Sequence, residues 1–138
     1  MCSNSPKLVL LFCGKRKSGK DFLTDWLQDH LVKGGKESTI LKLSGPIKSC
    51  YAKNNNLNFE ELMGDGKYKE KFRSDMVTWS EEIRNRDPGY FCRQSEEMYN
   101  AKNFNIWIVS DCRRKTDFKY FESNYPSRKS FYYNSFLP

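Results

Sequence analysis

The chain has 138 residues, of which 38% are hydrophobic and 30% charged, and a formal net charge of +7. This length predicts a single domain with room for a hydrophobic core. The longest apolar run, residues 8–13, is far shorter than the ~20 residues of a membrane-spanning helix. The five cysteines have no paired spacing typical of disulfides or zinc sites. The positive charge predicts an anionic partner, either a nucleic acid or a highly phosphorylated small molecule, and the alternative is a general effect on solubility.

The first third of the chain predicts a strand, a helix and a second strand. The apolar run KLVLLFC (7–13) is typical of a strand buried on both faces of a parallel sheet. The segment DFLTDWLQDHLVK (21–33) predicts an amphipathic helix, which the glycine pair at 34–35 ends. STILKL (38–43) predicts the second strand, followed by a turn and a short helix. The expected apolar face of the first helix consists of Phe22, Leu23, Trp26, Leu27 and Leu31.

The second half of the chain continues this alternation. Apolar side chains recur at helical spacing from Tyr68 to Arg86, DPG (87–89) ends that helix, and another is expected from Tyr90 to about Asn100. NIWIVS (105–110) predicts a third strand, and a further helix is expected after it. Strands that alternate with helices predict an α/β fold with a parallel sheet and right-handed crossovers.

The segment FCGKRKSGKDFL (12–23) resembles a phosphate-binding P-loop with one unusual residue. The P-loop pattern is Gly, four residues, Gly, Lys, then Ser or Thr, and here an aspartate replaces the hydroxyl residue. A Gly-rich loop between a buried strand and a helix points backbone N–H groups and the positive helix end at an anion. We therefore predict a phosphate-binding loop formed by Gly14, Lys15, Arg16, Lys17, Ser18, Gly19, Lys20 and Asp21.

Asp21 has two compatible interpretations. Its carboxylate can bind Mg²⁺ directly or through water, because Mg²⁺ prefers oxygen ligands and keeps several waters. As an acid in the first turn of a helix it would also be stabilised by the helix dipole, by roughly 0.3–1 kcal/mol.

Further cations are expected at the same edge of the sheet, because ligands of open parallel sheets bind beyond the carboxyl ends of the strands. For an isolated Lys or Arg the alternative is a solvated surface charge, but DCRR (111–114) directly follows a predicted strand. So many cations suit a reaction between two phosphorylated molecules, because unit charges 4 Å apart in water repel by about 1 kcal/mol. The predicted set is Lys48, Lys69, Arg73, Arg84, Arg93, Arg113 and Arg114.

The sequence has few candidates for a general base. Its one histidine, His30, lies late in the first predicted helix and is expected to be packed or solvated. An acyl-transfer triad is therefore excluded. A phosphate acceptor needs no base, because the second pKa of a phosphomonoester is about 6. Phosphoryl transfer by positioning and charge stabilisation fits these residues.

Together these segments closely resemble animal-type phosphomevalonate kinase from residue 7 to about 125. The segments are LVLLFCGKRKSGKDFLTDWL, LSGPIK, YKEKFRSDM, WSEEIRNRDPGYFCR and IWIVSDCRR. The resemblance implies a nucleoside-monophosphate-kinase-like fold and transfer of the γ-phosphate of MgATP to (R)-5-phosphomevalonate, in the mevalonate route to isoprenoids and sterols. It implies that the phosphate-binding loop binds ATP, that Lys20 bridges the transferring phosphate, and that the seven cations handle phosphomevalonate or transition-state charge. Asp111 would be a magnesium or positioning residue, with a cap for the following helix as the alternative.

The resemblance ends near the C-terminus. Family members continue with further strands, an arginine-bearing lid and residues near the adenine. The last twelve residues, SRKSFYYNSFLP, do not align with that region and lack a helical stripe. We therefore expect an incomplete P-loop kinase domain over 1–126, without the C-terminal strands and lid, and a divergent tail over 127–138.

Alternative functions remain open at this point. One is another small-molecule or nucleotide kinase of the same fold, and another is a catalytically weak anion-binding or interaction module left by truncation. A nucleic-acid binder is less favoured, because the basic residues cluster at strand ends rather than along one stripe. We expect a monomer with small-molecule substrates and no nucleic-acid or membrane partner. The cytosol is the expected location, since no C-terminal peroxisomal tripeptide is present.

Overall fold

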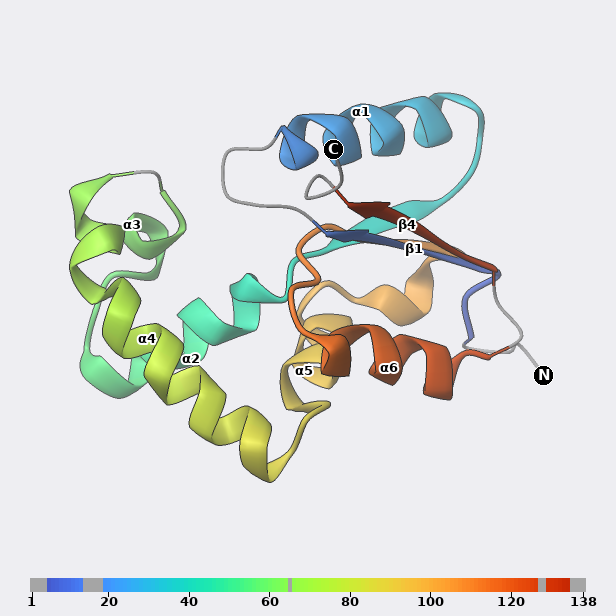
Figure 1. Cartoon of the computed structure of the whole chain (residues 1–138). Coiled ribbons are helices and arrows are strands. Elements are labelled where there is room, and N and C mark those ends of the chain that lie inside the picture. Colours follow the sequence, from blue (N-terminus) through green and yellow to red (C-terminus); the bar gives the residue numbers. More distant parts are fainter. Residues whose placement is uncertain (1–4, 14–18, 65, 127–128, 135–138) are drawn as a thin grey trace.

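The computed structural model describes residues 5–13, 19–64, 66–126 and 129–134, the last segment by its backbone only. Its centre is one parallel sheet in the order β2-β3-β1-β4 (Figure 1). The parallel sheet and its first three strands confirm the prediction from the sequence pattern. The strands are β1 (Leu8–Cys13), β2 (Ser38–Leu41), β3 (Ile106–Val109) and β4 (Lys129–Asn134).

Helices connect these strands within the described part of the chain. The predicted helices are present, whereas the short α3 and the 3-10 turn η1 were not predicted. The bounds are α1 (Lys20–Lys33), α2 (Ser44–Asn55), α3 (Phe59–Met63), α4 (Lys67–Arg86), α5 (Tyr90–Met98), η1 (Ala101–Asn103) and α6 (Lys115–Asn124). No helix among the described residues is long and apolar enough to cross a membrane.

The helices form layers on the two faces of the sheet. Figure 1 shows α1 over one face and α5 and α6 under the other. The main core contains Val9 and Leu11 of β1, Trp107 and Val109 of β3, and Phe121 of α6, all almost fully buried. The core therefore joins the central strands to the α5–α6 layer.

Helices α2, α3 and α4 form an arm that projects beside the sheet (Figure 1). A second apolar cluster holds the arm together, with Tyr51 of α2, Leu62 of α3 and Met76 of α4 buried in it. The Tyr51 hydroxyl also donates a hydrogen bond to Asp75 of α4. The arm therefore has a small apolar core of its own, separate from the main core.

The predicted apolar face of α1 is buried only in part. Phe22 is 79% exposed and Trp26 55% exposed, whereas Leu23, Leu27 and Leu31 are half-buried. Only α1 covers this face of the sheet among the described elements, so the outer aromatic side chains have no second layer to pack against. Trp26 instead stacks on the exposed His30, with ring centroids 5.3 Å apart.

Part of the predicted tail belongs to the sheet. β4 pairs with β1 in parallel along its whole length, from Leu8 opposite Lys129 to Cys13 opposite Asn134. The sequence pattern did not predict this strand, because the segment KSFYYN (129–134) has neither a continuous apolar run nor a clear alternation. Its three consecutive aromatic residues, which have high β-propensity, were the available signal. β1 is therefore an inner strand with a neighbour on each side.

Candidate functional site

A cavity of about 880 Å³ opens beyond the carboxyl ends of β1, β2 and β3. Its walls come from the start of α1, the start of α2, helix α4 and the loop after β3. The lining includes five lysines and four arginines but only three carboxylates. The cations are Lys20, Lys42, Lys48, Lys67, Lys69, Arg73, Arg84, Arg113 and Arg114, and the acids are Asp21, Glu70 and Asp111. Such an excess of positive charge in a concave site attracts and concentrates anions.

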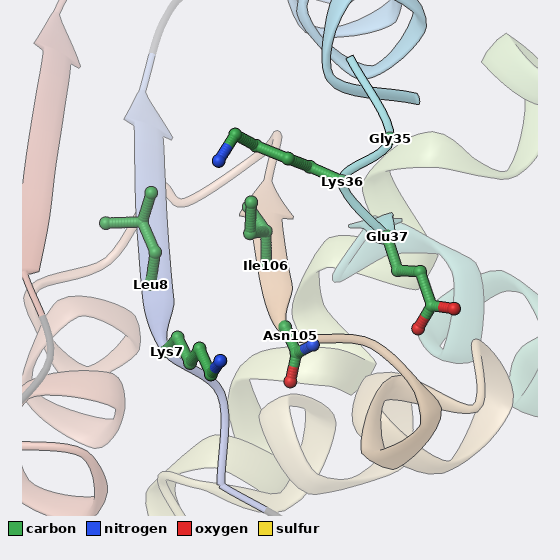
Figure 2. A pocket seen from close by; sticks show the side chains of 7 residues that line it. All are labelled: Lys7, Leu8, Gly35, Lys36, Glu37, Asn105 and Ile106. Carbon is green, nitrogen blue, oxygen red and sulfur yellow. The ribbon is translucent and has the colours of Figure 1, made fainter. Parts of the chain in front are cut away.

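A smaller hollow of about 460 Å³ lies at the opposite, amino-terminal edge of the strands (Figure 2). Lys7, Lys36 and Asn105 line it, and all three side chains are exposed. None of its seven lining residues is a buried polar residue that could fix a ligand. The larger cavity is therefore the candidate site.

The structure brings most of the predicted site residues together. Gly19, Lys20, Asp21, Lys48, Lys69, Arg73, Arg84, Asp111, Arg113 and Arg114 all line the larger cavity. Gly14, Lys15, Arg16, Lys17 and Ser18 lie outside the described residues. Lys42 and Lys67 also line the cavity and were not predicted. Their positions in the sequence could have predicted this, because Lys42 follows β2 directly and Lys67 begins α4.

Among the described residues of the predicted site, Arg93 alone does not line the cavity. It lies in the first turn of α5, and its guanidinium forms an ion pair with Asp87 at the corner between α4 and α5. The charge pattern placed it with the other cations, but a nearby carboxylate in the corner binds it instead.

Gly19, Lys20 and Asp21 form the start of α1. Gly19 is the N-cap with φ of 85°, a left-handed conformation that glycine adopts without strain. The next residue, Lys20, is only 8% exposed, and its Nζ lies 3.4 Å from Asp21 Oδ1. The Asp21 side chain is 63% exposed. The helix start thus brings a positive helix end, an ammonium and an accessible carboxylate to one wall of the cavity.

Asp111, directly after β3, holds the neighbouring wall in place. Its Oδ1 accepts the backbone N–H of Leu43 at 2.6 Å, and its Oδ2 accepts that of Ser44 at 3.0 Å. These N–H groups belong to the start of α2, where backbone donors have no partner within the helix. The alternative of a cap for the following helix was therefore wrong, because Asp111 caps α2, which lies far earlier in the chain.

At the start of α6, Arg114 is the N-cap and Asp117, in the first turn, accepts the backbone donors. Its Oδ2 accepts the backbone N–H groups of Arg113 and Arg114, at 3.2 and 3.1 Å. Asp117 is 1% exposed, and burial raises the pKa of its carboxyl group, although Arg84 nearby opposes this shift. The Cys92 thiol donates to Asp117 Oδ1 across 4.0 Å. This buried carboxylate fixes the backbone from which both arginines extend.

The thiols near the site remain protonated at neutral pH. Burial raises the pKa of Cys92 and of Cys112 well above the usual thiol range, and nearby Asp117 adds to the effect. Burial also raises the pKa of Cys13, which ends β1, although Arg113 and Lys20 oppose this shift. These three cysteines are free, and none is activated as a nucleophile.

Lys48 of α2 is a lining cation whose pKa is strongly lowered. Burial, together with the neighbouring charge of Lys69, lowers its pKa from 10.5 to about 8, while Asp111 opposes the shift. An anion bound beside Lys48 would stabilise its charged form. The cavity therefore contains a cation whose charge depends on pH and on ligand.

Comparison with known proteins agrees with this geometry. A sequence model of the family "Phosphomevalonate kinase" matches residues 12–127. The chain is 45% identical over 118 residues to a curated protein of Drosophila melanogaster named "Phosphomevalonate kinase". This alignment covers 85% of the chain and 61% of the relative, so the chain spans about three fifths of the relative's length. The P-loop-like segment and DCRR, from which the resemblance was drawn, lie within the matched residues. The chain belongs to the phosphomevalonate kinase family.

Proposed function

We propose that the protein transfers the γ-phosphoryl group of ATP to (R)-5-phosphomevalonate and so forms ADP and 5-diphosphomevalonate. The family membership supports the reaction, and one structural observation carries the proposal. Cations from two separate sources, the start of α1 and the opposing α4 with the loop after β3, line a single cavity. Two polyanions that must approach each other need such a two-sided arrangement.

ATP would bind on the α1 side. Lys20 begins the helix that follows β1, and its buried ammonium lines the cavity. An ammonium in this position can bridge the outer phosphates as charge moves toward the leaving group. Asp21 beside it limits the motion of the ammonium through their 3.4 Å contact.

Phosphomevalonate would bind on the opposite side. Lys69, Arg73 and Arg84 come from α4, and Arg113 and Arg114 from the loop after β3. The acceptor oxygen belongs to a phosphate whose second pKa is about 6, so it is already a nucleophile at neutral pH. The protein then contributes orientation and charge stabilisation rather than a base.

The cavity also fits Mg²⁺ as the cofactor. Among the described residues no group of three or more His, Cys, Asp or Glu side chains is arranged to hold a metal ion. Mg²⁺ in kinases does not need such a group, because one or two carboxylates and the substrate phosphates hold it. Asp21 and Asp111 line the cavity, and each Asp111 oxygen that accepts one N–H retains a second lone pair. Bound Mg²⁺ would neutralise charge that develops on the phosphates.

The proposal includes the location of the protein in the cell and its oligomeric state. We expect a cytosolic monomer that binds small molecules and neither nucleic acid nor membrane. Sedimentation of the purified protein and fractionation of cells would check the two expectations separately.

A coupled assay for ADP release tests the proposed reaction. The purified protein would be supplied with MgATP and either phosphomevalonate or a nucleoside monophosphate. We expect ADP release with phosphomevalonate only. Release with a nucleoside monophosphate alone would instead indicate another kinase of this fold. Binding of both substrates without ADP release would indicate an anion-binding module.

A further inference from the structure

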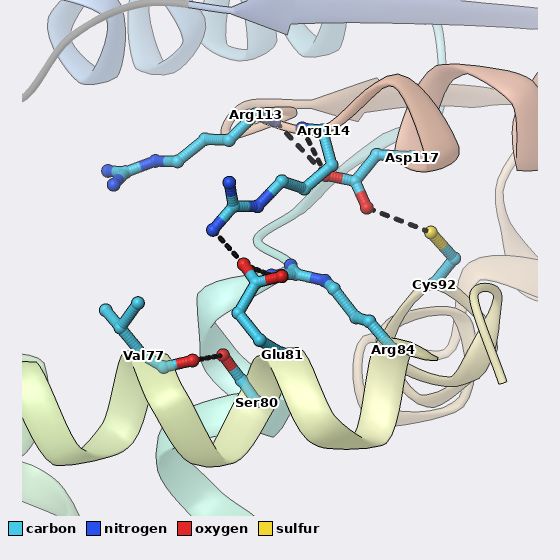
Figure 3. Close-up of polar contacts among 8 residues, drawn as sticks. All are labelled: Val77, Ser80, Glu81, Arg84, Cys92, Arg113, Arg114 and Asp117. Carbon is cyan, nitrogen blue, oxygen red and sulfur yellow. Dashed lines mark hydrogen bonds and ion pairs between the residues drawn. The ribbon is translucent and has the colours of Figure 1, made fainter. Parts of the chain in front are cut away.

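Glu81 lies between two of the cavity's arginines (Figure 3). It projects from α4 one turn before Arg84, and its Oε1 lies 3.9 Å from Arg84 Nη1. The same carboxylate oxygen forms an ion pair with Nη2 of Arg114, which belongs to the loop after β3. One carboxylate thus joins an arginine of the arm to an arginine of the loop after β3.

Glu81 contacts these arginines from outside the cavity lining. Arg84 and Arg114 both line the cavity, whereas Glu81 does not. A guanidinium has five N–H donors, so an ion pair at one edge leaves donors at the other edge for a ligand. The position of Glu81 therefore allows it to orient both side chains without occupying the space of a bound anion.

The two arginines need such a partner for different reasons. The Arg84 side chain is 12% exposed, lies over the Phe91 ring at 5.6 Å, and has an Nε without a hydrogen-bond partner among the described residues. A buried guanidinium with unmet donors depends on nearby negative charge, and Glu81 and Asp117 supply it. The Arg114 side chain is 46% exposed, so without the ion pair it would sample many rotamers in solvent.

We propose that Glu81 is a positioning residue for the phosphorylated acceptor, because it holds Arg84 and Arg114 in the orientation that binds the acceptor's phosphate. The inference rests on the proposed function for the identity of the acceptor, but the Glu81–Arg114 coupling is a property of the site itself. Preorganised cations bind an anion more tightly, since the cost of ordering long side chains has already been met. Removal of the Glu81 charge should therefore weaken anion binding, although it makes the cavity more positive.

Steady-state kinetics of Glu81→Gln provide the first test. The matched control is Glu82→Gln, which removes the same charge from an exposed neighbour on the same helix. We expect Glu81→Gln to raise the KM for phosphomevalonate about tenfold, with the KM for ATP unchanged and Glu82→Gln equal to wild type. Equal effects of the two variants, or a rise in the KM for ATP alone, would overturn the proposal.

A double-mutant cycle on the affinity for inorganic phosphate, measured by calorimetry, provides a second test that needs no turnover. The cycle combines Glu81→Gln with Arg114→Gln, and we expect Glu81→Gln to weaken phosphate binding less in the Arg114→Gln background, where only its contact with Arg84 remains, than in the wild-type background. Additive losses would overturn the proposal, as would tighter binding in Glu81→Gln, which would mean that the carboxylate competes with the anion.

If Glu81→Gln fails to fold, the variant Glu81→Asp replaces it. This variant keeps the charge but shortens the side chain, and it should also weaken phosphate binding. Absence of phosphoryl transfer by the wild type would contradict the proposed function and leave this cycle to decide on Glu81.

Discussion

The carboxylate of Asp111 accepts the backbone N–H of Leu43 at 2.6 Å, across 68 positions of sequence. The contact joins the end of β3 to the start of α2, which begins the arm that carries α4. It is a buried, charge-assisted hydrogen bond, and such bonds are about twice as strong as neutral ones. The bond therefore helps to fix the arm beside the cavity.

Asp111→Ala should therefore lower the free energy of unfolding by about 1–3 kcal/mol, because two N–H groups at the start of α2 lose their acceptor. Urea denaturation would measure the change. The control is Asp21→Ala, which removes a 63% exposed carboxylate at the same cavity and should cost less than about 1 kcal/mol. A cost for Asp21→Ala equal to that for Asp111→Ala would contradict the structural role of Asp111.

Lys20→Met should abolish phosphoryl transfer and leave the fold intact. The ammonium lines the cavity, so it contributes charge to the phosphates, while methionine fills a similar volume in the buried position. We expect a loss of turnover of at least about 10²-fold and an unchanged thermal melting curve. Lys36→Met is the matched control, since Lys36 is exposed and lies at the opposite edge of the sheet. Normal turnover in a folded Lys20→Met protein would remove Lys20 from the mechanism.

Lys48 should make acceptor binding sensitive to pH. Burial lowers its pKa to about 8, so the free protein loses this charge as the pH rises through that value. The acceptor's phosphate keeps its charge in this range, because its second pKa is about 6. We therefore expect the KM for phosphomevalonate to rise between about pH 7.5 and about pH 9.5 in the wild type. Lys48→Arg, which stays charged, should show a flat profile, and a rise of the same size in that variant would assign the effect to another group.

The titration of Lys48 should also affect the stability of the fold, and here a rise in pH is favourable. The folded pKa of Lys48 lies below its ordinary value of 10.5, so between about pH 8 and pH 10.5 the unfolded chain binds more protons than the folded one. The contribution of Lys48 to the free energy of unfolding should therefore increase with pH across this window. Lys48→Met should remove that increase, as measured by urea denaturation at several pH values. A steeper increase in the variant would show that the sign is wrong.

Gly45→Ala should destabilise the start of α2 through a steric clash. A Cβ at this position would lie 2.1 Å from the hydroxyl oxygen of Tyr99 and 3.3 Å from the sulfur of Met98. Tyr99 must then move, and overpacking of this kind costs about 1–3 kcal/mol. In the double variant Gly45→Ala with Tyr99→Phe the closest of these atoms is absent, so thermal melting should recover in part. No recovery would place the cost elsewhere than at Tyr99.

Strong local patterns were sufficient to predict the main elements. β1 follows from a continuous apolar run, α1 from the glycines on both sides, and α4 from apolar side chains at helical spacing. The carboxyl ends of parallel strands share one edge of a sheet, so chain order alone predicted that Lys20 and Arg113 would lie at the same edge. These features depend on the chemistry of neighbouring residues, which the sequence contains directly.

The tertiary structure decided which partner each side chain finds. Asp111 caps α2 rather than the following helix, Arg93 pairs with Asp87 outside the cavity, and Glu81 joins two arginines that no local pattern links. Whether an apolar helix face is covered depends on a second layer of structure. Trp26 of α1 is therefore more than half exposed, although the apolar residues of α1 recur at amphipathic spacing. The physical reason is common to these cases, because a hydrogen bond, an ion pair or a buried contact depends on atoms that the fold brings from distant parts of the chain.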